Sequence, residues 1–315
     1  MTWHHPWLSL TGPESGDVVV VTPKLAGWDH AGLHVLRLEP GAMRTVETGE
    51  SEVFVLPLSG GLTIEVADAS APGQTETRLA LTGRSSVFER VTDFAYVGRG
   101  SMLRMISAHG AEVALPSARC EQRRPPLYGP ADAVPVEVRG AGPATRQVTN
   151  FGTPETWADA ERLMCCELIT PPGNWSSHPP HKHDGTPGCE VANEEIYFFR
   201  IAGSDGVTPS RDGFGLHRTY TGPEHIAAGL EEVDETVEVR DGDVFVIPYG
   251  YHGPSTAAPG YPMYYLNVLA GPAEHRSMAF CDDPMHSWVR DGWAQLPADP
   301  RCPVTSANGR VDQEP

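Results

Sequence analysis

The sequence is short of lysine and of basic residues in general. Only Lys24 and Lys182 are lysines among the 23 basic residues, and 41 aspartates and glutamates give the 315-residue chain a formal net charge of −18. Nucleic acids and anionic membrane surfaces are polyanions that would repel such a chain, so neither is expected as a partner. The scarcity of lysine itself is typical of a genome that prefers arginine codons.

Long apolar runs and C-x-x-C cysteine motifs are also missing. No stretch approaches 18 consecutive apolar residues, which argues against a membrane-spanning helix. The first residues hold neither the basic nor the apolar segment of a secretory signal, so we expect a cytoplasmic protein with reduced thiols. None of the six cysteines forms a C-x-x-C pair, so neither a zinc finger nor a thioredoxin-type site is indicated.

Glycine and proline, by contrast, make up about a fifth of the chain, with 33 and 30 residues. This excess is typical of a turn-rich all-β protein. Short apolar or alternating runs between Gly, Pro, Asp and Ser clusters predict strands at 18–21, 33–38, 52–58, 62–66, 86–88, 94–97, 102–106, 163–169, 196–201, 215–220, 236–239, 244–247 and 263–269. Short helices are expected at 224–232 and 283–293, the second with Asp282 or Asp283 as its N-cap.

The strands form two series with a shared pattern. Each series has a strand ending in Pro-Gly, then a polar segment, then an acidic residue that leads an apolar strand, at Glu52 and at Glu195. Such a repeat predicts two copies of one β-barrel or jelly-roll unit. We therefore expect an N-terminal domain at 1–115, a Pro/Gly-rich connector at 116–145, a C-terminal domain at 146–300 and a flexible tail at 301–315.

A cluster of potential metal ligands lies in the second series. His181 and His183 are two residues apart, so on a strand both imidazoles face one side. Glu195 opens the next apolar strand, and His252 follows a glycine-rich turn. Three histidines and one carboxylate can hold a divalent ion and leave positions open for substrate. His178 is an alternative ligand, although two prolines separate it from His181.

A lone His-x-His is more often a surface pair, but here the surrounding pattern resembles the cupin signature. That signature has His-x-His, a Glu, and then Gly-x5-Pro-x-Gly followed by His, which fits Gly242 to His252. The chain departs from the common form in two spacings. Eleven residues separate His183 from Glu195, and only one residue separates Gly250 from His252. The first series has no His-x-His, so the N-terminal copy should be metal-free.

Longer sequence segments resemble those of a specific enzyme family. The segments 174–184, 194–200, 242–252 and 260–271 resemble 5-deoxy-glucuronate isomerase of myo-inositol catabolism, which is similar to the two-cupin 4-deoxy-5-ketouronate isomerase of pectin breakdown. The resemblance implies an all-β fold of two tandem cupin domains. It implies an aldose–ketose isomerisation of 5-deoxy-D-glucuronate to 5-dehydro-2-deoxy-D-gluconate through an enediol. It also implies one divalent metal ion held by His181, His183, Glu195 and His252. Zinc is the expected ion, and manganese, iron or nickel would fit the same ligands.

Further site residues are expected near the motif. A proton must be moved between carbons, and Tyr251, Glu194 or a metal-bound water are candidates, although Glu194 and Glu195 cannot both face inward on a regular strand. A sugar-acid substrate requires a cationic partner for its carboxylate, with Lys182, Arg200 and Arg218 as candidates. Tyr220 and Tyr265 could hold substrate hydroxyls. For each of these residues, a solvated, interface or packing role is the alternative.

Two other functions use the same ligands or the same fold. A bicupin dioxygenase could hold iron with the same three histidines and glutamate, and a non-catalytic sugar-binding cupin would need no metal. The long family-like phrases favour the isomerase. A homo-oligomer is expected, with the metal-free N-terminal sheet as its interface.

Overall fold

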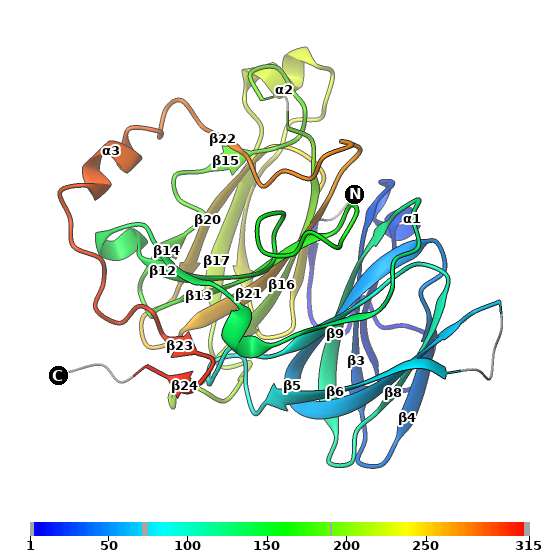
Figure 1. Cartoon of the computed structure of the whole chain (residues 1–315). Helices are drawn as coiled ribbons and strands as arrows, with labels where there is room; N and C mark the ends of the chain where they lie inside the picture. The colour runs from blue at the N-terminus through cyan, green and yellow to red at the C-terminus, as the bar shows by residue number, and fades with distance from the viewer. Residues whose placement is uncertain (1–2, 71–74, 190, 312–315) are drawn as a thin grey trace.

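The computed structural model describes residues 3–70, 75–189 and 191–311, and these residues form mostly antiparallel β-structure in two halves that lie side by side (Figure 1). Short helices lie at the edges of the sheets: α1 (Pro23–Ala26), α2 (Pro223–Ala227) and α3 (Val289–Trp293). Two 3-10 turns span Ala131–Ala133 and Gly142–Ala144. None of the helices in the described ranges is long and apolar enough to cross a membrane.

The N-terminal half is one sheet that curls around its own core. Its strands are β2 (Asp17–Val21), β3 (Ala31–Leu38), β4 (Met43–Glu47), β5 (Ser51–Asp68), β6 (Thr75–Arg84), β7 (Phe94–Val97), β8 (Ser101–Ile106), β9 (Ala111–Arg119) and β10 (Leu127–Gly129). The long strand β5 pairs with β7 and β9 through its first part and with β6 and β8 through its second part. It therefore joins the two layers around an apolar interior that includes Leu36, Ile64 and Leu103.

The C-terminal half has two facing sheets. The first has the order β1-β19-β16-β21-β13-β12-β11, and the second has the order β18-β17-β20-β15-β22, with β14 paired to β20. Tyr197 and Phe199 of β16 pack against His217 of β17, so the two sheets share one core. The strands are β1 (His4–His5), β11 (Val136–Arg139), β12 (Arg146–Gly152), β13 (Met164–Thr170), β14 (Trp175–Ser176), β15 (His181–Lys182), β16 (Glu194–Ile201), β17 (Gly215–Tyr220), β18 (Asp234–Val239), β19 (Val244–Ile247), β20 (Tyr251–Ala257), β21 (Met263–Ala270) and β22 (Cys281–Asp282).

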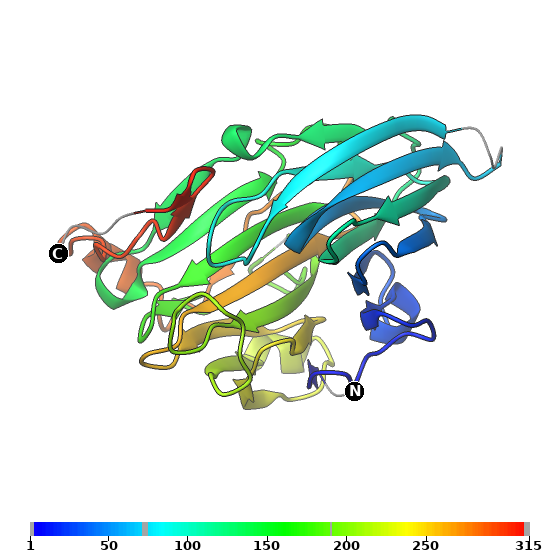
Figure 2. The ribbon, with the colours of Figure 1, turned by 90° about the horizontal axis from the view of Figure 1, so that it is seen from below.

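The N-terminal end of the chain crosses to the C-terminal half, whereas the C-terminal hairpin stays next to β12 of its own half and also contacts the N-terminal half (Figure 2). The N-terminal strand β1 pairs with β19 of the C-terminal sheet. Near the C-terminus, β23 (Thr305–Ser306) pairs with β24 (Gly309–Arg310), and the Val91 N–H donates to the Ser306 carbonyl of this hairpin. Residues 304–305 are buried, although they belong to the tail that we expected to be flexible. The tail residues 312–315 lie outside the described part of the chain.

Two glutamates, the buried Glu52 and the partly exposed Glu194, connect the two halves reciprocally. Glu52 of the N-terminal half accepts backbone N–H donors from residues 161–163 at 2.6 to 2.8 Å. Glu194 of the C-terminal half accepts the backbone N–H groups of residues 29–31 at 2.7 to 2.9 Å. Each glutamate thus holds the segment that leads into a central strand of the other half, β13 or β3. The connector expected at 116–145 carries β10, which joins the first sheet, and β11, which joins the second.

Three local expectations were wrong. Residues 86–88 form a turn instead of a strand, and the Ser86 hydroxyl accepts the Phe88 N–H there. The helix expected at 224–232 ends at Ala227, before Gly229 with its positive φ. The helix expected at 283–293 spans only its last five residues, because the Asp283 side chain accepts the Met285 N–H in a turn.

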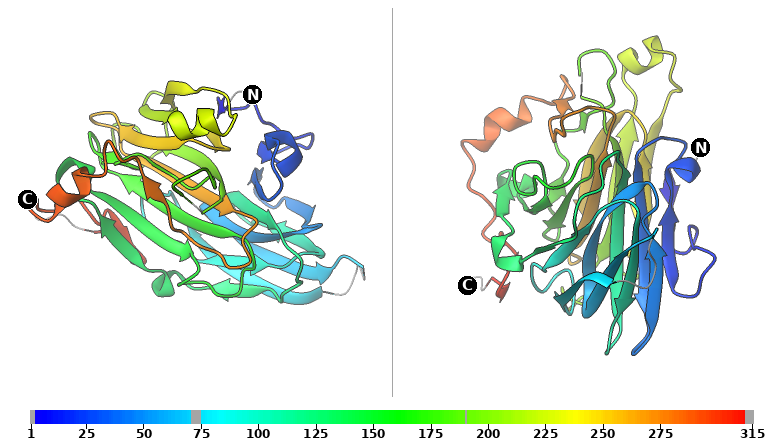
Figure 3. Two further views of the ribbon diagram at one scale, coloured as in Figure 1. Left: turned by 90° about the horizontal axis from the view of Figure 1, so that it is seen from above. Right: turned by 45° about the vertical axis from the view of Figure 1, so that its right-hand side comes forward.

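The thiols also differ from expectation. A disulfide joins Cys189 to Cys281, so the expectation of six reduced cysteines was wrong for this pair. The remaining four cysteines are free, and Cys165 and Cys166 are buried in β13 as predicted. The disulfide links the segment after His183 to β22 beside it (Figure 3 shows this region from two further sides).

Candidate metal centre and its cavity

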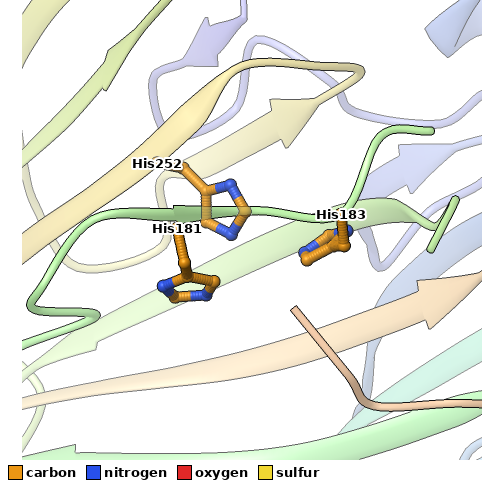
Figure 4. Close-up of side chains that lie close together, drawn as sticks. All are labelled: His181, His183 and His252. Carbon is orange, nitrogen blue, oxygen red and sulfur yellow. The ribbon is translucent and has the colours of Figure 1, made fainter. Parts of the chain in front are cut away.

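The three predicted histidines come together between the sheets of the C-terminal half. His181 lies on β15 opposite His252 on β20, and His183 follows β15. One ring nitrogen from each lies within 4.8 Å of the others, and Figure 4 shows the three side chains gathered at one place. The alternation of side chains along a strand explains why residues 181 and 183 share a side.

Glu195 completes the cluster from the opposite sheet. It is buried at the start of β16, and its Oε2 lies 3.1 Å from His183 Nε2 and 3.0 Å from His252 Nε2. The long insertion between His183 and Glu195 does not separate them, because it forms a closed loop. Within that loop Asn193 N–H donates to the His183 carbonyl at 2.7 Å.

Local backbone geometry sets the position of His252. Gly253 has φ of 97°, and a Cβ there would lie 1.9 Å from the Ser177 carbonyl oxygen. Only glycine allows β20 to pass this close to the segment before β15. On the other side, the Gly250 N–H donates to the Asp184 carboxylate at 2.8 Å, which ties the turn before His252 to the residue after His183.

Backbone carbonyls orient all three imidazoles. The Nδ1 atoms of His181, His183 and His252 lie 3.4, 3.0 and 3.3 Å from the carbonyl oxygens of Pro179, Asn193 and Gly250. A ring N–H held on Nδ1 leaves the Nε2 lone pair free to bind a metal, as is usual for histidine ligands. His252 Nε2 is buried and has no hydrogen-bond partner of good geometry, although Glu195 is near. Its lone pair therefore points to the shared space.

The electrostatics also fit a cation. Burial, reinforced by His252 and His183, holds the pKa of His181 well below its usual value, so this imidazole is neutral. Burial alone would raise the pKa of Glu195, but the imidazoles of His183 and His252 beside it outweigh burial, and the pKa falls below its usual range. Burial lowers the pKa of His183 but the Glu195 carboxylate raises it more, so a bound cation would have to displace the His183 proton before this ring could act as a ligand. Neutral imidazoles with an ionised carboxylate are the donor set that divalent ions prefer. The residues present therefore fit a divalent metal.

A cavity of about 570 Å³ opens onto this cluster. His181, His183 and Glu195 form part of its wall, together with the hydroxyls of Ser177 and Tyr197. Its lining also includes three arginines, Arg139, Arg146 and Arg290. A cavity of this volume is in the range that holds small ligands.

Four of the predicted residues line a different cavity, of about 680 Å³: Lys182, Arg218, Tyr220 and Tyr251. Lys182 and Tyr251 are sequence neighbours of the ligands, so strand alternation turns them to the opposite face. Lys182 Nζ lies 2.9 Å from Glu224, and Arg218 is paired with Asp234 at 3.0 Å.

The other predicted residues lie outside both cavities. Glu194 accepts the backbone donors of residues 29–31. Arg200 is buried between Asp241 at 2.8 Å and Glu112 at 3.1 Å. Tyr265 is buried behind the cavity wall, where its hydroxyl bonds Ser176 at 2.9 Å and lies 3.1 Å from Ser177. His178, the alternative ligand, is not part of the cluster.

Sequence reasoning missed Tyr197, Ser177 and Arg146 as cavity residues. Tyr197 lies two positions after Glu195 on β16, so the alternation that selected the histidines would also have selected it. Arg146 carried no such signal, because it lies on β12, far from the motif in the chain.

The chain is similar in sequence to known enzymes. The chain is 38% identical over 280 residues to the 5-deoxy-glucuronate isomerase of Geobacillus kaustophilus, covering 88% of this chain and 92% of that protein. It is 32% identical over 271 residues to the 5-deoxy-glucuronate isomerase of Bacillus subtilis strain 168, covering 85% and 91%.

Solved structures show the same architecture. An IolB-like protein from Salmonella typhimurium LT2 superposes with a TM-score of 0.78 at 28% identity, covering 92% of this chain and 99% of that one. Oxalate decarboxylase of Lactobacillus farciminis, solved as a formate complex, superposes with a TM-score of 0.59 at 12% identity, covering 88% and 89%, and shares the fold alone. The predicted all-β fold of two tandem cupin domains is confirmed. Because a family model also matches residues 8–289, the chain belongs to the KduI/IolB family.

Proposed function

We propose that this protein is an aldose–ketose isomerase that converts 5-deoxy-D-glucuronate to 5-dehydro-2-deoxy-D-gluconate in inositol degradation. The relatives described above carry the name 5-deoxy-glucuronate isomerase and align along most of the chain. The observation that carries the proposal is the cluster of three histidines and Glu195, of which His181, His183 and Glu195 line a cavity that also contains Ser177, Tyr197 and arginines. Arginines and hydroxyls can bind the carboxylate and hydroxyls of a sugar acid, and a metal ion can polarise its carbonyl.

In this proposal a divalent ion, zinc first, is held by His181, His183, Glu195 and His252. When bound, the ion supplies Lewis acidity toward the oxygens of the carbonyl and the neighbouring hydroxyl. The orphaned Nε2 of His252 and the ionised Glu195 support this assignment. The four ligands do not discriminate zinc from manganese, iron or nickel.

The residues of the chain hold the substrate oxygens and exclude bulk water. Tyr197 and Ser177 present hydroxyls to the cavity, and these lie 3.2 Å apart, close enough to hold two adjacent oxygens of a sugar. Phe280 packs against His181 with ring centroids 4.6 Å apart and covers one side of the ligand cluster. Since Tyr251 and Glu194 do not line this cavity, water held in the cavity is our preferred carrier for the proton between the two carbons.

The test is an NMR assay of purified protein with 5-deoxy-D-glucuronate, combined with elemental analysis. We expect conversion to the ketone with one bound ion per chain. His181→Ala and His252→Ala should each lose the ion and lower kcat by at least about 100-fold, since metal-site ligands cannot be replaced by water without loss of position. His109→Ala, at an exposed turn of the metal-free half, is the control. Full turnover in both ligand variants would contradict the metal role.

Oxygen uptake with the sugar acid left unchanged would instead favour the dioxygenase alternative. Binding of the sugar acid without turnover and without a metal would favour a non-catalytic sugar-binding protein. Both outcomes are read in the same samples, by an oxygen electrode and by calorimetry.

Self-association and a cytoplasmic location also belong to the proposal. The N-terminal sheet, which we expected as the interface, stays a prediction; in addition, Met285 and Trp288 of the C-terminal half are 77% and 67% exposed, which supports a contact between copies there. Sedimentation analysis tests it. Four free cysteines support a reducing compartment, whereas the Cys189–Cys281 disulfide does not. Cell fractionation with thiol labelling tests the location.

A further inference from the structure

Arg146 is a buried cation without a carboxylate partner. It lies on β12 with 4% of its surface exposed, and its Nη1 donates to the Ala144 carbonyl at 3.1 Å. Its Nε is buried and has no hydrogen-bond partner. Among the residues that the structure describes, no carboxylate lies within ion-pair distance of its guanidinium. A buried charge is costly unless it is paired, so an unpaired one indicates a partner that binds from outside the chain.

The other arginines of the metal cavity are already neutralised. Arg139 forms a two-point contact with Glu137 at 2.8 and 2.9 Å. Arg290 forms a two-point contact with Asp282, one bond of which is 2.8 Å long. Arg146 is therefore the one cavity-lining arginine in the described ranges whose charge is not compensated. Burial above all, and Arg139 and Arg290 in addition, lower the pKa of Arg146 to about 10, which still leaves it charged at neutral pH.

The guanidinium of Arg146 is also held in place. It lies over the Trp293 ring at 5.6 Å, and the guanidinium of Arg290 lies over the same ring at 4.9 Å. Stacking on an aromatic ring fixes the plane of a guanidinium, and a fixed plane can receive a carboxylate through two parallel hydrogen bonds. The β12 strand places this group in the same cavity as His181, His183 and Glu195.

We propose that Arg146 is the anchor for the carboxylate of the sugar-acid substrate and that it selects uronates against neutral sugars. This inference rests on the proposed function for the identity of the substrate, although the anchor itself requires only an anionic sugar. The arginines and lysine near the metal motif in sequence do not compete for the role, because Lys182, Arg200 and Arg218 are each ion-paired and none lines this cavity.

The first experiment compares Arg146→Met and Arg146→Lys with the wild type on 5-deoxy-D-glucuronate. Charge-assisted two-point bonds give a large share of affinity, so Arg146→Met should raise KM about 10- to 100-fold with a much smaller change in kcat. Arg146→Lys keeps the charge without the planar fork and should lie between the two. Arg104→Met, which removes an ion pair of the metal-free half, is the matched control and should leave KM unchanged.

The second experiment separates this inference from the proposed function. Calorimetry measures the binding of D-glucuronate and of its neutral methyl ester to each metal-loaded variant. The wild type should prefer the acid, and the preference should be lost in Arg146→Met and reduced in Arg146→Lys. This ratio is internal to each protein, so partial loss of folded protein does not change it.

The outcomes separate cleanly. A wild type that prefers the acid but does not isomerise 5-deoxy-D-glucuronate overturns the proposed function and leaves the anchor standing. An unchanged acid-to-ester ratio in both Arg146 variants overturns the anchor. If Arg218→Met abolishes the ratio while Arg146→Met keeps it, the carboxylate binds in the second cavity instead, which also overturns the anchor.

Discussion

A buried ion pair links the two halves. Arg84 at the end of β6 pairs with Glu167 of β13, and both side chains are buried. Tyr264 donates to the same carboxylate at 2.7 Å, and burial together with the Glu167 charge holds its pKa well above the usual value. The group is a fully buried ion pair whose members come from opposite halves.

Replacing Arg84 with Met should destabilise the protein by about 3–5 kcal/mol, because Glu167 would be left charged and buried without its cation. Urea denaturation followed by intrinsic fluorescence measures the loss. The double variant Arg84→Met with Glu167→Leu should recover most of it, since no unpaired charge remains. A single variant as stable as the double variant would contradict this explanation.

Asp299, near the C-terminus, makes a pH-dependent contribution to the free energy of unfolding. Hydrogen bonds from Arg301 outweigh burial and lower the pKa of Asp299 to about 2, with Asn174 as a further donor. A carboxyl whose pKa is lower in the folded protein stabilises it above the unfolded pKa of about 4, and the effect is lost as the pH falls through about 2. Discounted for its contact with solvent, the contribution at pH 7 is about 1 kcal/mol.

Asp299→Asn should therefore be less stable than the wild type at pH 7 by about 1 kcal/mol. The difference should narrow as the pH is lowered from 5 toward 2. Thermal unfolding of both proteins across this range measures it, and a difference that stays constant with pH would show that the charge of Asp299 is not involved.

The histidine cluster could be predicted from the sequence, and the place of Arg146 in the same cavity could not. His181, His183 and His252 follow from alternation and from a turn motif, both of which are local in the chain. Lys182 and Tyr251 were chosen because they adjoin those ligands, and the same alternation directs them to the other cavity. Arg146 is joined to the site only by the pairing of β12 in the sheet, for which no short-range pattern exists.

At the scale of elements, the loop between His183 and Glu195 replaces the short connection of a common cupin motif. The disulfide from Cys189 to Cys281 ties this loop to β22 across 92 residues of chain. Lys182 of β15 pairs with Cys281 and His181 pairs with Asp282, so the link lies on the strand next to His181. The position of His183 therefore depends on this link as well as on β15.

Replacing both Cys189 and Cys281 with Ser should lower stability by about 2–4 kcal/mol under oxidising conditions, because the link constrains the unfolded chain. It should also speed the loss of metal to a chelator. Cys302→Ser, at a free half-buried thiol, is the control. Denaturation with and without reductant measures the effect, and equal stability of wild type and variant without reductant would mean that the link contributes nothing.

Strands were predicted more reliably than helices for a physical reason. Alternating patterns and apolar runs reflect burial in a sheet. They can be recognised within one short segment of sequence, as in 244–247 and 263–269. The two expected helices lay in polar segments where Asp and Gly can form turns instead. Side-chain hydrogen bonds such as that of Asp283 decide the outcome, and they depend on neighbours that the local sequence does not specify.

At the scale of the whole molecule, the charge of −18 opposes an anionic substrate, while the metal cavity concentrates arginines. The negative charges that lie far from the pocket repel the substrate only at long range. Salt screens this repulsion beyond a Debye length, which falls from about 30 Å at 0.01 M salt to about 8 Å at 0.15 M. The unpaired Arg146 acts at contact distance. Local attraction should therefore dominate the affinity.

We expect the KM for 5-deoxy-D-glucuronate to change by less than about twofold when salt increases from 0.01 to 0.15 M, because a contact with the buried Arg146 is screened far less than the distant negative charges. Initial rates at several salt concentrations measure this. Arg146→Met should raise the KM to a similar extent at every salt concentration. A KM that falls steeply with salt in the wild type would show that the overall negative charge governs binding.

The repeat in the sequence predicted two barrels, but it did not predict that segments near both chain ends contact the other half. The pairing of β1 with β19, and the hydrogen bond from Val91 to the hairpin of β23 and β24, join residues more than 200 positions apart. Such contacts leave no periodic signal. The position of β1 follows from the open edge of β19, which it covers.

The hydrogen bonds that Glu52 and Glu194 accept from the opposite halves limit which mutations and truncations this enzyme can tolerate. Each carboxylate satisfies three backbone N–H groups that belong to the other barrel. A chain cut between the barrels would leave six such donors without their acceptors and two carboxylates without their donors. The N-terminal half is thus required to support the other barrel, and mutations that weaken it should affect the reaction centre without changing any residue there.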